Sequence, residues 1–104
     1  FARRDPLSAR LYATAIQAEG DSHGWDDDYA AARPQHERAE AFIAGLPPAL
    51  RDHAEVMSAR SANLRLLGEV YHRTGNPGPA RATLARAVAI SRRLVTASPE
   101  DPAK

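Results

Sequence analysis

Four histidines and a group of aspartates are the residues in this sequence whose types suit metal binding or acid–base chemistry. The histidines are His23, His36, His53 and His72. No two of them have the His-x-x-x-His spacing that places two ligands on one helix face, so a zinc site would need separate segments to converge. We therefore expect neither a metal nor a cofactor.

The aspartates gather between Asp21 and Asp28, in a segment that also contains Ser22 and His23. This segment lacks the alternating acids, central glycine and distal glutamate of an EF-hand loop. Its Asp-Ser-His run has the residue types of a hydrolase triad, but neighbours in sequence do not form triad geometry. We expect a solvated loop whose last aspartates favour the start of a helix, and we expect the protein not to be an enzyme.

Composition sets further limits on the class of protein. The 104 residues include no cysteine, which excludes disulfides and thiolate chemistry and is compatible with a reducing, cytoplasmic location. No apolar run reaches the roughly 18–20 residues that span a bilayer, so we expect no membrane insertion. Because the chain begins at Phe1 rather than Met, we expect a segment of a larger, bacterial-type protein.

Charge is distributed unevenly along the chain. Residues 1–55 contain ten acidic and six basic residues, a net charge of −4, whereas residues 56–104 contain three acidic and eight basic residues, a net charge of +5. A basic half can attract acidic partners, or its arginines can be solvated helix faces. The arginines are spread along the chain with Tyr71 as the only aromatic residue among them, so we expect no nucleic-acid binding.

The elements that must position these residues are helices. The first is expected over about 6–18, with Asp5 as N-cap and Pro6 at the first helical position. Gly20 is expected to end it, and a loop is expected over 21–25. Its buried face is predicted from helical spacing to contain Leu7, Leu11, Ala15 and Ala18, widened by Tyr12 and Ile16.

Three more helical segments follow. The second is expected over about 26–44, with a kink or restart near Arg33 because Pro34 lies inside it. The third begins near Pro48 and extends to 73, either as one helix or as two with a break near Arg60. Residues 74–78 break the chain, and the last helix is expected from 79 to 97, with the buried stripe Ala80, Leu84, Ala87, Ile90 and Leu94.

A motif spans the turn between the last two helices. The chain has Leu64-x-x-Leu67-Gly68-x-x-Tyr71, then Gly75, then Ala80, Leu84 and Ala87. This pattern resembles one tetratricopeptide repeat (TPR) at about residues 61–99, with leucine where the family has Trp and Phe. Pro99 falls seven residues later than the family's closing proline, so the second helix of the unit is lengthened.

The resemblance implies an all-α fold of about four helices in antiparallel hairpins, with TPR-like right-handed stacking. Residues 1–46 would be a divergent helical pair with an acidic loop, 47–99 the TPR-like hairpin and 100–104 a tail, together forming one compact domain. Because close packing of the hairpin needs small residues, Gly68, Ala80 and Ala87 are predicted to lie where its two helices meet.

The same resemblance implies a protein–protein interaction scaffold, with a protein or peptide partner and a capacity for self-association. A partner groove would be lined by Arg65, Glu69, His72 and Arg73, together with Ala62. Trp25 and Tyr29 are either a plug that pins the acidic loop to the core or a hot spot for a partner. The alternative function is a regulatory helical bundle that binds a small ligand or peptide between the two hairpins, against Trp25, Tyr29 and Phe42.

Overall fold

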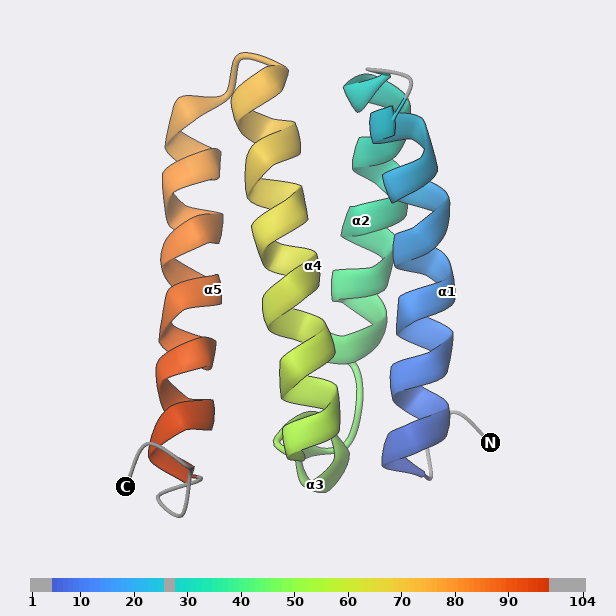
Figure 1. The fold of residues 1–104 in the computed structure, drawn as a ribbon, viewed down its shortest axis with the longest axis vertical. Helices are drawn as coiled ribbons and strands as arrows, with labels where there is room; N and C mark the ends of the chain where they lie inside the picture. The colour runs from blue at the N-terminus through green and yellow to red at the C-terminus, as the bar shows by residue number, and fades with distance from the viewer. Residues whose placement is uncertain (1–4, 26–27, 98–104) are drawn as a thin grey trace.

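The computed structural model describes residues 5–25 and 28–97, and these residues form five helices and no strand. The helices are α1 (Pro6–Trp25), α2 (Tyr29–Ala44), α3 (Pro48–Arg51), α4 (Ala54–Arg73) and α5 (Pro77–Ala97). Consecutive long helices run antiparallel, and α4 lies between α5 and the α1–α2 pair (Figure 1). The all-α, antiparallel prediction is confirmed.

The first helix begins as predicted but ends later. The Asp5 carboxylate accepts hydrogen bonds from the Ser8 amide and hydroxyl, at 3.2 and 2.9 Å, which caps the helix. The predicted end at Gly20 and the predicted loop over 21–25 are wrong, because α1 continues to Trp25. Gly20 is buried, and a Cβ there would lie 2.8 Å from Nε2 of His36. This glycine therefore permits close contact with α2 and does not reverse the chain.

The predicted buried face of α1 is correct only at Ile16, because the other predicted residues, Leu7, Leu11, Tyr12, Ala15 and Ala18, are exposed. Leu7 and Leu11 are 54% and 61% exposed, while Ala9, Ala13 and Ile16 are buried. A face of small side chains lets the α1 backbone approach α2 closely, and this gain in close packing decides the orientation of the helix. The larger leucines are left facing outward.

The second helix is continuous through Pro34, so the predicted restart near Arg33 is wrong. Residues 26 and 27, where we expected the helix to begin, lie outside the described residues. The helix starts at Tyr29, where the Asp28 carboxylate accepts a hydrogen bond from the Ala31 amide at 3.1 Å. Pro34 is exposed and lies in the second turn of the helix. Its missing N–H therefore leaves only one carbonyl, that of Ala30 in the first turn, without an intrahelical donor.

The third predicted segment is divided near its start and not near Arg60. The short helix α3 ends at Arg51, and His53 then caps α4, its Nδ1 accepting a hydrogen bond from the Glu55 amide at 3.2 Å. Arg60 lies within α4 and forms an ion pair with Glu40 of α2, at 2.6 Å between Nη2 and Oε2. The polar position that suggested a break is therefore a contact between helices.

The turn between α4 and α5 lies within the predicted breaker. The Thr74 hydroxyl donates to the Val70 carbonyl at 2.8 Å, and Gly75 has a φ of 81°, a left-handed conformation that favours glycine. The last helix then begins at Pro77, two residues earlier than predicted, because proline suits the first position of a helix. It ends at Ala97, as predicted.

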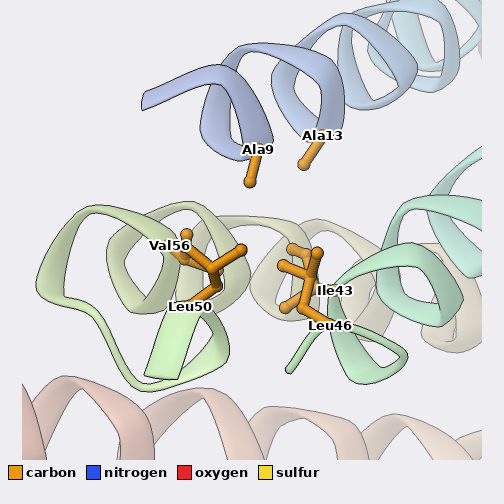
Figure 2. Close-up of a cluster of buried hydrophobic side chains, with 6 residues drawn as sticks. All are labelled: Ala9, Ala13, Ile43, Leu46, Leu50 and Val56. Atoms are coloured by element: carbon orange, nitrogen blue, oxygen red, sulfur yellow. The ribbon is translucent and has the colours of Figure 1, made fainter. Parts of the chain in front are cut away.

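Two hydrophobic clusters hold the helices together. One joins α1, α2, α3 and α4 (Figure 2), and Phe42 packs against it. The other joins α4 and α5, with Leu94 packed against it. The first consists of Ala9, Ala13, Ile43, Leu46, Leu50 and Val56, and the second of Met57, Leu64, Ala87 and Ile90.

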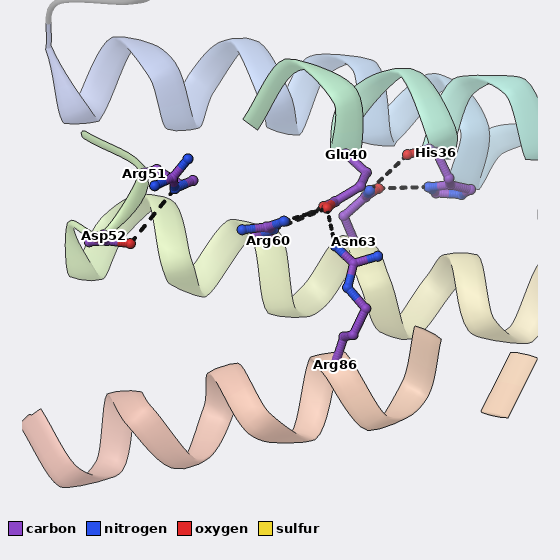
Figure 3. A network of polar contacts seen from close by, with 7 residues as sticks. All are labelled: His36, Glu40, Arg51, Asp52, Arg60, Asn63 and Arg86. Carbon is purple, nitrogen blue, oxygen red and sulfur yellow. Dashed lines mark hydrogen bonds and ion pairs between the residues drawn. The ribbon is translucent and has the colours of Figure 1, made fainter. Parts of the chain in front are cut away.

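A polar network also connects α2, α4 and α5 (Figure 3). The Glu40 carboxylate accepts hydrogen bonds from Nε and Nη2 of Arg60. It also accepts one from Nη2 of Arg86 at 2.6 Å. Beside it, Asn63 donates to the backbone carbonyl of His36 at 2.8 Å, and its Oδ1 lies 3.0 Å from Nδ1 of the His36 ring. Both His36 and Asn63 are buried, so this reciprocal pair satisfies polar groups inside the helix packing.

Candidate partner-binding groove

The four residues predicted to line a partner groove lie together in the structure. Arg65, Glu69, His72 and Arg73 line a hollow of about 370 Å³ along the C-terminal half of α4. Gly68 and Leu84 complete the lining of this hollow. The helical spacing of the four residues places them on one face of α4, and α5 supplies the opposite wall through Leu84.

A larger groove continues from this hollow along the α4–α5 seam. Its volume is about 840 Å³, and Arg65 lines both parts, so the two form one surface, which we call the α4–α5 groove. The larger part is lined mostly by α5, through Leu84, Ala87, Val88, Ser91, Arg92, Val95 and Thr96, with Ser61 and Arg65 from α4.

The groove is hollow because its floor is made of small side chains. The Ser61 hydroxyl lies 2.7 Å from the hydroxyl of Ser91 and 3.2 Å from the carbonyl oxygen of Ala87, so these polar groups are partnered within the floor. Gly68 has the same effect further along, since a Cβ there would lie 2.6 Å from Cγ of Leu84. Gly68, Ala80 and Ala87 are all buried where the two helices meet, as predicted.

The outer side of α5 supplies an exposed apolar stripe. Leu84, Val88 and Val95 are 38%, 49% and 67% exposed, and all three line the groove. With Ser91 they recur at i, i+4, i+7 and i+11, which places them on one face of α5. α5 packs mainly against α4, so this face has no helix of the described chain over it.

The predicted hot spot lies partly within the described residues. The side chain of Trp25 lies outside them. Tyr29 is half-buried, and the guanidinium of Arg73 lies 5.5 Å from its ring centroid, a distance typical of a cation–π contact. Tyr29 thus contacts one of the predicted groove residues, Arg73, but it does not line the hollow itself.

A second tyrosine near this end belongs to a hydrogen-bonded group. The Tyr71 hydroxyl donates to Oε2 of Glu37 at 2.7 Å, and Nε of Arg33 donates to the same oxygen at 3.0 Å. Burial opposes ionisation of Glu37, but the hydrogen bonds from Tyr71 and Arg33 outweigh it, so the pKa of Glu37 is lowered. Burial and the Glu37 carboxylate both raise the pKa of Tyr71.

Two of the aromatic residues of the alternative, ligand-binding hypothesis, Tyr29 and Phe42, lie far apart in the structure. Tyr29 and Phe42 lie near opposite ends of α2, roughly 20 Å apart along its axis at 1.5 Å per residue. Phe42 packs instead against the first hydrophobic cluster, with its ring centroid 4.7 Å from that of Tyr12.

The apolar half of the groove was not predicted from the sequence. The predicted stripe of α5 included Leu84, Ala87 and Leu94, but Val88 and Val95 were not assigned a role. The signal was present, because these valines extend a second helical stripe beside the buried one.

Other kinds of site receive no support from the described residues. Among the residues whose side chains the structure describes, no group of three or more His, Asp or Glu is arranged to hold a metal ion. None of the five helices is long and apolar enough to cross a bilayer. Comparison of the chain with protein-family models, with curated proteins and with solved structures found no match.

Proposed function

We propose that this chain is a protein-interaction module that binds a helical segment of a partner protein in the α4–α5 groove. The observation that carries the proposal is the apolar stripe of Leu84, Val88 and Val95, exposed above a floor of small residues. From Leu84 to Val95 the stripe extends about 16 Å, which corresponds to three turns of a bound helix. Amphipathic helices bind such grooves through side chains at i, i+4 and i+7.

The order and packing of the helices support a TPR-like version of this module. The pairs α1–α2 and α4–α5 are antiparallel hairpins, and α4 packs against both helices of the first pair. The close approach at Gly68 also suits the repeat pattern. In such a module, the face of α4 with Arg65, Glu69, His72 and Arg73 would bind the partner together with α5.

The proposal is tested by selection from a display library of amphipathic peptides. The peptides are about four helical turns long, with leucine fixed at i, i+4, i+7 and i+11 and the other positions varied among Ala, Gln, Glu and Lys. We expect the chain to enrich binders, and we expect Val88→Asp to abolish their binding by placing a charge in the apolar wall.

The matched control is Leu11→Asp, which introduces the same charge at an exposed apolar residue of α1. Both positions are exposed, so each variant should remain within about 0.5 kcal/mol of the parent in stability, which a thermal melt checks. Failure to enrich any peptide, or equal loss of binding in both variants, would contradict the proposed function.

A further inference from the structure

Two of the four arginines of α5 have no carboxylate partner among the described residues. This helix contains four arginines and no acidic residue. Arg86 pairs with Glu40 and Arg93 lies 3.8 Å from Asp52, but Arg81 and Arg92 have no carboxylate partner among the described residues. The surface of α5 therefore has uncompensated positive charge.

Most arginines in the described part of the chain are paired. Seven form an ion pair with a carboxylate, namely Arg10, Arg33, Arg51, Arg60, Arg73, Arg86 and Arg93. The four described arginines without one are Arg38, Arg65, Arg81 and Arg92.

Two of these four, Arg65 and Arg92, line the α4–α5 groove. Arg65 extends from α4 and Arg92 from α5, so they flank the apolar stripe from different helices. The one carboxylate of the groove, on Glu69, lies at its narrower end and is already 3.4 Å from the guanidinium of Arg73. A ligand in the apolar part of the groove therefore meets two positive charges and no free negative charge.

We infer that the partner segment is an acidic amphipathic helix, with apolar residues on Leu84, Val88 and Val95 and carboxylates paired with Arg65 and Arg92. This inference rests on the proposed function and specifies the chemistry of the occupant. Complementary charges at the rim of an interface determine which partner is accepted and accelerate association. Arginine also forms bidentate hydrogen bonds with carboxylates, which favours Asp or Glu at those positions.

A second copy of this chain is a poorer occupant. The exposed apolar face of α1, with Leu7 and Leu11, is the obvious surface that a copy would offer. From Pro6 to Ala18 that helix contains no acidic residue, and its one charged side chain is Arg10. A copy docked through the part of α1 from Pro6 to Ala18 would offer Arg65 and Arg92 no carboxylate of that helix.

The test compares two peptides of opposite charge on variants of the intact chain. The probes are the best glutamate-flanked peptide from the selection and its twin with every glutamate replaced by lysine. Fluorescence anisotropy measures their dissociation constants on the parent chain, on the double variant Arg65→Glu/Arg92→Glu and on Arg81→Glu. Arg81→Glu is the matched control, because Arg81 also lacks a carboxylate partner but does not line the groove.

We expect the glutamate peptide to bind the parent chain at least about tenfold more tightly than its twin, a difference of about 1.4 kcal/mol. The double variant should reverse this preference, and Arg81→Glu should leave it unchanged. Equal binding of both peptides, or the same loss in Arg81→Glu, would overturn the acidic-helix inference while leaving the groove as a docking site. Binding of neither peptide would instead overturn the proposed function itself.

Sedimentation of the chain alone tests the remaining alternative, in which a second copy of the chain occupies the groove. If the partner is an acidic helix, we expect the chain alone to be a monomer, and we expect the glutamate peptide to bind that monomer. Association of the chain with itself that is lost in both Val88→Asp and Leu11→Asp would assign the groove to a second copy, and would contradict the inference.

Discussion

At the scale of single residues, Gly68 is a position where one added carbon would clash with a neighbouring helix. A Cβ at this position would lie only 2.6 Å from Cγ of Leu84, which is closer than van der Waals contact allows. Gly68→Ala should therefore cost about 1–3 kcal/mol of unfolding free energy through overpacking. In a Leu84→Ala background the same change should stabilise the protein by up to about 1 kcal/mol, since alanine is the better helix former. Urea unfolding of the four chains measures this coupling, and an equal effect of Gly68→Ala in both backgrounds would refute it.

The Glu37 group predicts a pH dependence of stability. Its pKa is lowered in the folded protein, because the hydrogen bonds from Tyr71 and Arg33 outweigh the opposing effect of burial. A carboxyl group with a lower pKa in the folded state stabilises the fold above its unfolded pKa, near 4.5, and loses this contribution as the pH falls through the folded value. Tyr71→Phe removes one hydrogen bond and should flatten this acid-side loss in thermal melts between about pH 6 and pH 2. An unchanged pH profile would exclude the coupling.

Glu40 should be the most important acidic residue for stability, because it binds arginines from two other helices. Glu40 and Arg60 are 13% and 18% exposed, whereas Arg86 is 51% exposed. Glu40→Ala would leave the half-buried Arg60 unpaired and should cost about 2–3 kcal/mol. Arg86→Ala should cost at most about 1 kcal/mol, as for exposed ion pairs. Equal losses in chemical unfolding would show that burial does not set the strength of this network.

At the scale of the helices, α2 is predicted to contain a removable defect at Pro34. Pro34 is exposed, lies within a continuous helix and lacks the N–H that would donate to the carbonyl of Ala30. Pro34→Ala should raise the unfolding free energy, by up to about 3 kcal/mol. Thermal unfolding measures this gain, with Ala30→Gly as a control that should lower stability by about 1 kcal/mol. Loss of stability in Pro34→Ala would show that α2 depends on the proline geometry.

The helices themselves were largely predictable, because Asp5, Pro6 and the 74–78 breaker are local signals that fix where chain segments start or stop. The face that each helix buries was less predictable. Leu7 and Leu11 suggested one face of α1, but the small residues opposite them allow closer packing on α2. Gly20 likewise has two uses, as a helix end or as a close contact, and only the position of His36 decides between them.

The candidate groove shows the same division between local and tertiary information. One repeat-like motif placed Arg65, Glu69, His72 and Arg73 on a common face of α4, and the structure shows that they line one hollow. The apolar part of the groove depends on which side of α5 stays uncovered. That depends on the packing of α5 against α4, which the sequence pattern alone does not determine.

At the scale of the whole molecule, the two ends of the helical assembly differ. α1 ends it on one side with exposed leucines and no acidic residue from Pro6 to Ala18, and α5 ends it on the other with valines, leucine and unpaired arginines. Ion pairs bind seven of the eleven described arginines to carboxylates of the chain. The α5 side is therefore the face on which apolar exposure and free positive charge coincide.

The most direct test of the docking account is to map a bound glutamate-flanked peptide by amide chemical shifts on the labelled chain. The account predicts that the largest changes occur at Arg65, Leu84, Val88 and Val95, with α1 unaffected. It also predicts that the affinity falls as the salt concentration rises, because the rim charges are screened. Largest changes around Leu7 and Leu11 of α1 would contradict the assignment of the α4–α5 groove as the docking site.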